Sequence, residues 1–253
     1  MTKGWHGYVI NLDGSDDRLA GIAGSLAAQG LTFTRIAAVD GRGRAPTAFD
    51  AYVPDRARRF YGRDLFGSEV ACALSHIAAL RAFLASDAAV CVIFEDDILL
   101  APDFSARLAA VLDRLTLMRP GWGLLHLHPR RFRYSSALAR VDDLDLRALH
   151  EFPVLTGGIA YTHQGAEAVL AGCTPVRAPW DVYLKDVVSR YDIGFGIRPA
   201  LVTLAQHPSE IAQTTQASKE ITGALGWWRK QRRIVTHELR GLVHMVRATT
   251  RPR

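Results

Sequence analysis

Three acids stand directly behind an apolar run in the segment CVIFEDDILL, residues 91–100. The run is typical of a strand buried on both faces, and the acids that follow it are Glu95, Asp96 and Asp97. Neighbouring carboxylates repel one another, and burying one without a partner is costly. We therefore expect a positive group to meet them. Glu95 and Asp97 could both face a hard divalent cation whose other ligands are phosphate oxygens, whereas a solvated acidic turn is the alternative.

Other residues of chemical interest lie on two expected helices. Glu69 and His76 are seven positions apart on a helix expected over residues 67–86, so they lie nearly on one face. They could point towards the acids, although a lone helical histidine is more often a structural hydrogen-bonding residue. Asp181 follows Pro179 and Trp180 at the start of another expected helix, where it is either a residue near the N-cap or a general base beside a sugar-binding tryptophan.

Two weaker candidates have simpler explanations. His126 and His128 alternate along an expected strand and could form a metal pair, but no matching acid is near them in sequence, so we favour structural histidines. Gly157 and Gly158 would allow a ligand to approach the backbone closely, and a β-bulge would need the same residues. The fingerprints GxSxG, GxxxxGK[ST] and GxGxxG do not occur, so the common hydrolase, P-loop and dinucleotide motifs are missing.

The elements expected around these residues indicate an α/β fold. A strand over residues 8–12, a helix over 14–30 and a strand over 31–41 form a β-α-β unit at the start of the chain. Asn11, Asp40 and the acid cluster each follow such a strand. In open α/β sheets the ligand crevice lies beyond the carboxyl ends of the strands, so these residues should share one rim.

Further along, apolar periodicity predicts helices over 102–115, 165–173 and 180–190, and strands over 89–94, 122–128, 152–163 and 196–206. Residues 129–150 are polar and are expected to be irregular. We expect a single Rossmann-type domain over residues 1–225 with a mostly parallel central sheet, followed by a basic helical tail over residues 226–253.

The positive charge of the chain is concentrated in that tail. Of the 31 basic and 25 acidic residues, eight basic and one acidic lie in residues 226–253, which leaves 23 basic and 24 acidic residues in the body. A neutral body argues against a nucleic-acid partner. In the tail, Val235, Leu239, Leu242 and Val246 form one helical stripe behind two tryptophans, which is typical of an interfacial helix on an anionic membrane. A basic helix packed on the body or a disordered end are the alternatives.

The cellular compartment is inferred from composition. Three sparse cysteines are typical of free thiols in a reducing compartment. The N-terminal residues lack the apolar core of a signal peptide, and no stretch approaches the length of a membrane span. We therefore expect a cytoplasmic protein, peripheral on the cytoplasmic face of the inner membrane.

Taken together, the motifs resemble glycosyltransferase family 25, the lipopolysaccharide-type β-galactosyltransferases related to the collagen galactosyltransferases. YVINLDGSDDR looks like the opening INL-x-x-S-x-x-R segment, GSEVACALSH is similar to GE-[IV]-GC-x-LSH, and VIFEDDI is similar to LEDD. TGGIAYTHQGAEAVL and PWDVYL resemble YLIS-x-x-GA and P-[VI]-D. The ordered set runs from about residue 7 to 212, with departures from the pattern at Gly14, Ala71 and Trp180.

The resemblance implies a GT-A fold, a nucleotide-sugar donor, usually UDP-galactose, and an inverting transfer that depends on Mn²⁺ or Mg²⁺. By that resemblance Glu95 and Asp97 hold the metal on the diphosphate, and Glu69 and His76 support the site. The donor-binding residues would be Asn11, Arg18, Asp40 and Asp96. For the general base that takes the proton of the acceptor hydroxyl, we choose Asp181. The acceptor would be lipopolysaccharide or another glycan, lipid-linked at the membrane.

Two rival functions remain open. A metal-dependent phosphoesterase could also use acids at a strand end, but it would need a second set of acids and histidines converging on two metals. A membrane-recruited protein that binds a nucleotide sugar without turning it over would keep the fold, and the intact acid triplet argues against it.

Overall fold

The computed structural model describes residues 4–128, 132–205 and 223–250. Its centre is an eight-stranded sheet in the order β2-β1-β3-β8-β5-β9-β7-β6. The strands are β1 (Trp5–Asn11), β2 (Phe33–Ala37), β3 (Val90–Glu95), β5 (Leu124–His126), β6 (Ser135–Val141), β7 (Leu144–Leu149), β8 (Gly158–Thr162) and β9 (Gly194–Arg198). β7 and β8 run opposite to the other six strands, so the predicted α/β class with a mostly parallel central sheet is confirmed.

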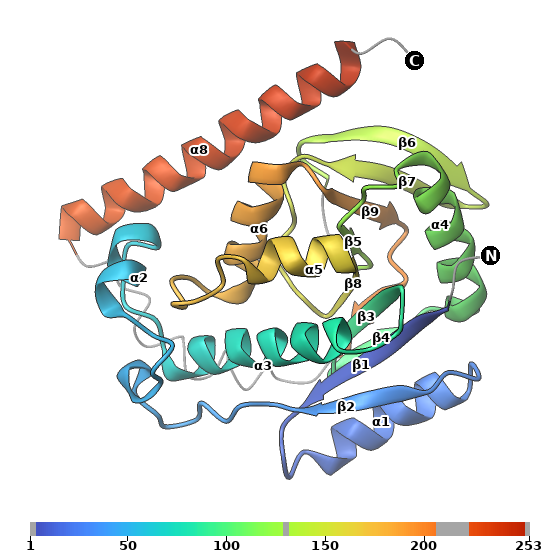
Figure 1. The fold of residues 1–253 in the computed structure, drawn as a ribbon, viewed down its shortest axis with the longest axis horizontal. Coiled ribbons are helices and arrows are strands. Elements are labelled where there is room, and N and C mark those ends of the chain that lie inside the picture. The colour runs from blue at the N-terminus through green and yellow to red at the C-terminus, as the bar shows by residue number, and fades with distance from the viewer. Residues whose placement is uncertain (1–3, 129–131, 206–222, 251–253) are drawn as a thin grey trace.

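Helices cover both faces of this sheet (Figure 1). One face packs on α3 (Gly67–Leu84), α5 (His163–Leu170) and α6 (Trp180–Tyr191), and the other on α1 (Asp16–Ala27) and α4 (Phe104–Met118). Alternate residues of β3 belong to the two cores: Ile93 lies in the first and Phe94 in the second. The apolar run before the acids is therefore buried on both faces, as its composition predicts.

Two regions differ from the expected pattern. Irregular structure was expected over residues 129–150, but in the described part of that range, residues 132–150, β6 and β7 form an antiparallel hairpin whose turn contains Asp142 at a positive φ of 51°. β6 is only half-buried and carries polar residues, so its apolar signal is weak. In addition, β4 (Ile98–Leu100) pairs with β10 (Val202–Leu204) in a separate two-stranded sheet just beyond the acid cluster. Between β2 and α3 the chain also forms the short helices η1 (Pro46–Ala48) and α2 (Pro54–Phe60).

The predicted tail is one long helix, α8 (Gly223–Thr250). It crosses one side of the molecule and contacts α2, α6 and β6 (Figure 1). The helix begins three residues before the expected boundary at residue 226, and residues 251–253 of the predicted tail lie outside the described part. None of the helices in the described ranges is both long enough and apolar enough to span a bilayer.

Candidate active site

Several polar residues meet at one edge of the sheet because of the strand directions. β1, β2 and β3 are parallel, so their carboxyl ends meet at the same edge. Asn11 and Glu95 are the last residues of β1 and β3, and Asp40 lies three residues after β2. β8 is antiparallel to β3 and therefore begins there, with Phe94 opposite Gly158. This topology also brings Thr156, which precedes β8, against Glu95.

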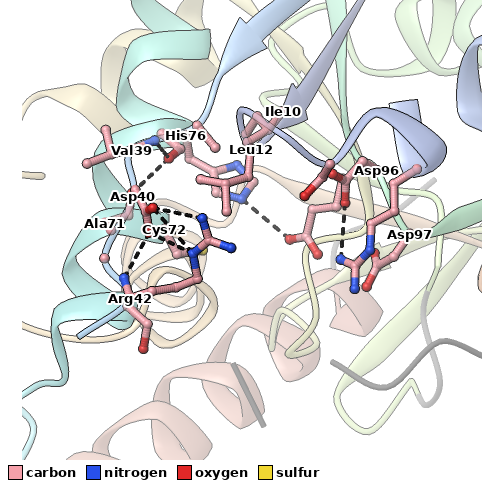
Figure 2. Close-up of a pocket in the computed structure, with 17 residues that line it drawn as sticks. Ile10, Leu12, Val39, Asp40, Arg42, Ala71, Cys72, His76, Asp96 and Asp97 are labelled. Carbon is pink, nitrogen blue, oxygen red and sulfur yellow. Dashed lines mark hydrogen bonds and ion pairs between the residues drawn. The ribbon is translucent and has the colours of Figure 1, made fainter. Parts of the chain in front are cut away.

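A pocket with a cavity volume of about 190 Å³ opens to solvent at this edge. Figure 2 shows Asp40 and Arg42 on one side of the pocket and Asp96 and Asp97 on the other, with His76 between them. The lining includes Arg18, Asp40, Arg42, Ser68, Cys72, Ser75, His76, Glu95, Asp96 and Asp97.

Glu95 is held by two neighbours from different elements. Thr156 donates its hydroxyl to Glu95 Oε1, and His76 Nε2 of α3 lies 3.5 Å from the same oxygen. Burial raises the pKa of Glu95, but the hydrogen bonds and charge of its neighbours outweigh that effect, and the net pKa is lowered. Glu95 is therefore ionised and fixed in orientation. Thr156 was not among the expected site residues, and its place before the Gly157–Gly158 pair was the only sequence signal for it.

Asp96 faces the first strand and the first helix. Asn11 Nδ2 donates to Asp96 Oδ2 at 2.7 Å, and Arg18 Nη1 lies 3.6 Å from Asp96 Oδ1. Asn11 is itself buried, and its Oδ1 accepts a hydrogen bond from Arg35 Nε at 3.0 Å. Asn11 thus positions Asp96 from behind the pocket, whereas Arg18 lines it.

Asp97 is the least compensated of the three acids. Its Oδ1 is buried without a hydrogen-bond partner among the described residues. Burial, together with repulsion from Glu95 and Asp96, raises the pKa of Asp97 to about 6. A buried carboxylate oxygen that faces two other acids is the kind of group that a cation would satisfy.

His76 links the acids to α6. Its ring is 2% exposed and stacks on Trp180, with ring centroids 5.3 Å apart and an interplanar angle of 14°. Trp180 is the first residue of α6, and Asp181 follows it. Asp181 Oδ1 accepts from the Val182 amide at 2.7 Å, and burial raises the pKa of Asp181, to which the charge of Glu95 adds. Asp181 lies outside the pocket lining but close enough to the acids for that charge effect.

The opposite wall of the pocket comes from the segment after β2. Arg42 binds Asp40 with three side-chain hydrogen bonds: Nε donates to Oδ1 at 3.1 Å and to Oδ2 at 3.3 Å, and Nη2 donates to Oδ2 at 2.9 Å. These bonds lower the pKa of Asp40. Asp40 remains half-exposed at the rim. Arg42 is a pocket residue that sequence reasoning missed, although its position two residues after Asp40 could have indicated it.

This wall sits directly on the start of α3. A Cβ on Gly67 would lie 2.0 Å from the Arg44 carbonyl oxygen, and one on Gly41 would lie 2.7 Å from the Cβ of Ala71. The alanine at 71, where the resembled pattern has glycine, is therefore accommodated by the missing side chain at Gly41. Ser75 of α3 also holds the segment after β2, because its Oγ accepts a hydrogen bond from the Val39 amide at 2.9 Å.

Glu69 has a different place from the one expected. Both of its oxygens are bound by the Arg63 guanidinium, at 2.7 and 2.8 Å, and Oε2 also accepts from the Phe66 amide at the start of α3. Both side chains of the ion pair are 10% exposed. Glu69 thus caps α3 and pairs with Arg63 outside the pocket lining, while His76 of the same helix lies inside it.

His126, the last residue of β5, and His128, two residues beyond it, both hydrogen-bond with the backbone of neighbouring segments. His126 Nε2 hydrogen-bonds with the Leu155 carbonyl at 2.9 Å, and its Nδ1 accepts from the His128 amide at 3.1 Å. Burial lowers the pKa of His126 to about 3, so the ring is neutral. Within the described ranges, no three His, Cys, Asp or Glu side chains converge as a complete metal cage.

A model of glycosyltransferase family 25 (LPS biosynthesis protein) matches residues 5–144, which is 140 of the 253 residues. The chain belongs to glycosyltransferase family 25. Asn11, Arg18, Asp40, Glu69, His76 and the three acids all lie within the matched residues, and Asp181 lies beyond them.

The relatives of this family 25 chain include a protein named as a galactosyltransferase and one named as probably inactive. Procollagen galactosyltransferase 1-A of Xenopus laevis is 25% identical over 204 residues, 77% of this chain and 33% of that protein. Probable inactive glycosyltransferase 25 family member 3 of Rattus norvegicus is 28% identical over 189 residues, 73% of this chain and 33% of that protein. The chain thus spans about a third of the length of these relatives.

Among solved structures, one similar chain is a glycosyltransferase involved in the glycosylation of the major capsid of PBCV-1. It has a TM-score of 0.40 and 10% sequence identity, and the match covers 91% of this family 25 chain and 99% of that chain.

Proposed function

We propose that this family 25 protein transfers galactose from UDP-galactose, with inversion, to a hydroxyl group of lipopolysaccharide or another surface glycan. Family membership supports the class of reaction. The observation that carries the proposal is the buried Asp97 Oδ1, which has no hydrogen-bond partner in the described part of the chain and lies in an open pocket that Glu95 also lines. A buried carboxylate oxygen without a partner favours the binding of a positively charged ligand.

The residues present fit a bound Mn²⁺ or Mg²⁺. Such ions are often held in proteins by only one or two carboxylates, with substrate phosphates and water completing the coordination. Glu95 and Asp97 would be those carboxylates, which agrees with the lack of a complete protein cage in the described part of the chain. When bound, the ion supplies charge neutralisation for the diphosphate leaving group.

The remaining pocket residues would orient the donor. Asn11 and Arg18 hold Asp96 in place, so that its neighbours on either side keep a fixed direction. His76 and Thr156 do the same for Glu95. On the opposite wall Asp40, held by Arg42, would accept hydrogen bonds from the hydroxyl and amide donors of the nucleoside.

Asp181 is our candidate for the general base. The carboxylate of Asp181 would take the proton of the acceptor hydroxyl. At the same time the hydroxyl oxygen forms a bond to the anomeric carbon of the sugar, and the bond between that carbon and the β-phosphate oxygen breaks. A base works best when its pKa lies near the working pH, and burial raises the pKa of Asp181 in that direction. Its position next to Trp180, which stacks on His76, connects it to the acid cluster.

The test is calorimetric titration of UDP into the purified protein with and without Mn²⁺, in wild type and in Asp97→Asn. We expect Mn²⁺-dependent binding that the substitution weakens at least about tenfold. Asp87→Asn, in the exposed segment before β3, is the matched control and should bind as wild type does. Absence of UDP binding under every metal condition would refute the proposed donor class.

Turnover separates the rival functions. Incubation with UDP-galactose should release UDP slowly to water and faster with a glycan acceptor. Metal-dependent UDP binding with no release of UDP would instead identify a nucleotide-sugar-binding protein that lacks turnover, in line with the relative named as probably inactive. Cleavage of simple phosphate esters in place of UDP-galactose would favour the phosphoesterase.

A further inference from the structure

α8 has two faces with different surroundings. Its inner face packs on the body, where Gly226, His237 and Gly241 are buried. The contact is close, since a Cβ on Gly62 would lie 2.7 Å from the Gly226 carbonyl oxygen. The helix is therefore part of the folded molecule over much of its length, which agrees with one of the alternatives left open by its sequence.

Polar contacts fasten this inner face to α6. His237 Nε2 lies 3.2 Å from Asp186 Oδ1, and both side chains are only 4% exposed. Arg240 reaches the same oxygen at 3.4 Å, and one turn further His244 Nδ1 lies 3.6 Å from Asp192 Oδ2. The rotation of α8 about its own axis is thus fixed, and with it the direction in which the other face points.

The outer face is apolar and exposed. Its large residues recur at intervals of three, four or seven positions and are between 42% and 59% exposed: Leu225, Trp228, Val235, Leu239, Leu242 and Val246. Trp227 and Val243 beside them are exposed as well. An apolar stripe of this extent on a helix of 28 residues, about 42 Å at 1.5 Å per residue, marks a docking surface.

The charge of α8 indicates what docks there. Six basic residues and one acid lie in residues 223–250, and the acid, Glu238, is paired with Arg133 of the body. Arg232 and Arg247 are exposed beside the apolar stripe. A second copy of the same face would bring two positive helices together, whereas anionic lipid headgroups would be attracted. Adjacent tryptophans at one end also match the membrane–water interface.

We infer that the outer face of α8 docks on an anionic lipid bilayer, with the helix lying in the plane of the headgroups and its apolar stripe inserted at the acyl boundary. This surface does not depend on the reaction proposed for the pocket. Because α8 is fastened to α6, and α6 begins at Trp180 and Asp181, docking would hold the pocket in one orientation towards the membrane.

The experiment is co-sedimentation of the full chain with vesicles of phosphatidylcholine, with and without phosphatidylglycerol. The main variant is Val235→Gln/Leu239→Gln/Leu242→Gln, which removes the stripe without changing charge. We expect binding to anionic vesicles to fall at least about tenfold in this variant. Leu117→Gln on α4, where Leu117 is 74% exposed, is the control and should bind as wild type.

The charge contribution is tested separately. Arg232→Gln/Arg247→Gln should weaken binding to anionic vesicles by about fivefold for each arginine at low salt. Arg114→Gln/Arg119→Gln, two exposed arginines in and just after α4, should leave binding unchanged. Circular dichroism and urea unfolding of each variant show that it is folded.

Three results would overturn the inference. The first is equal vesicle binding by wild type and the triple glutamine variant, and the second is an absence of binding to phosphatidylglycerol vesicles by the wild type. The third is a concentration-dependent dimer in analytical ultracentrifugation that the triple variant abolishes while vesicle binding persists, which would assign the stripe to a second copy of the chain.

Discussion

Glu95, Asp96 and Asp97 are consecutive carboxylates that meet three different sets of partners. Glu95 contacts His76 and Thr156, and Asp96 contacts Asn11 and Arg18. Asp97 Oδ1 has no such partner among the described residues. The three acids are therefore not interchangeable. Substitution of Asp96 should disturb the positions of its neighbours, whereas substitution of Asp97 removes a buried carboxylate oxygen that no described residue satisfies.

Asp97→Asn should stabilise the metal-free protein at neutral pH while it impairs binding of UDP. In wild type the raised pKa, about 6, means that the ionised carboxylate is penalised in the folded state. The free energy of unfolding falls as pH rises from about 4 towards 6, and it stays lower above that range. The variant lacks this penalty, so we expect a gain of about 1–2 kcal/mol at pH 7.5.

The measurement is urea unfolding of wild type and Asp97→Asn in chelator-treated buffer at pH 7.5 and pH 4.5. The gain should shrink at the lower pH, where Asp97 of wild type takes up its proton. A variant less stable than wild type at pH 7.5 would show that Asp97 is satisfied in the folded protein.

At the scale of elements, α3 does most to assemble the site. Its first turn lies against the segment after β2, with Gly67 and Gly41 allowing the close approach. Its third turn carries His76 to Glu95. Glu69 at its start is bound to Arg63 and to the Phe66 amide. We therefore regard Glu69 as a positioning residue that acts through the helix.

Glu69→Ala should destabilise the protein by about 3 kcal/mol, because it leaves the buried Arg63 guanidinium unpaired and removes the helix cap. Urea unfolding measures the loss. Arg63→Met/Glu69→Met removes both charges and should recover much of it.

A positioning role also predicts how UDP binding behaves. The folded fraction of Glu69→Ala should bind UDP within a few-fold of wild type when Mn²⁺ is present. Unchanged stability together with a complete loss of UDP binding would instead place Glu69 in contact with the substrate.

At the scale of the whole molecule, Asp186 joins the tail helix to the body. It lies on α6 and is approached by His237 and Arg240 of α8 and by Arg190 of its own helix. Burial raises the pKa of Asp186, but the hydrogen bond from His237 and the nearby positive charges outweigh burial, so the net pKa is lowered. One carboxylate thus compensates several cationic groups at the junction.

Asp186→Asn should destabilise the folded protein by about 1–2 kcal/mol at pH 7, since it removes the counter-charge of the partly exposed Arg190 and Arg240 and weakens the contact with the buried His237. Because the folded pKa of Asp186 is lowered, the contribution is present above about pH 4 and is lost as pH falls through the folded value. The difference from wild type should therefore shrink below pH 4.

Thermal unfolding across pH measures this difference, and limited proteolysis reports on the junction. We expect cleavage near α8 to be faster in Asp186→Asn than in wild type or in the surface control Asp87→Asn. An equal rate of cleavage in all three proteins would show that other contacts hold the helix.

Local patterns in the sequence determined much of this architecture. The apolar spacing predicts α1, α3, α4 and α6, and the runs before Asn11 and Glu95 predict β1 and β3. These signals are local because each helix or buried strand must present apolar residues at its own period. Family motifs and the placement of acids at strand ends then indicated the position of the pocket.

Only the tertiary structure decided which neighbour each polar group meets. The β6–β7 hairpin escaped prediction because its half-buried strand lacks a strong period. Thr156 reaches Glu95 because β8 runs antiparallel to β3, and Glu69 turns to Arg63 and away from the pocket. The apolar stripe of α8 was visible in the sequence, yet its exposure depends on which face the His237–Asp186 contact turns inward. Pairings between segments distant in sequence leave no local period, so packing alone determines them.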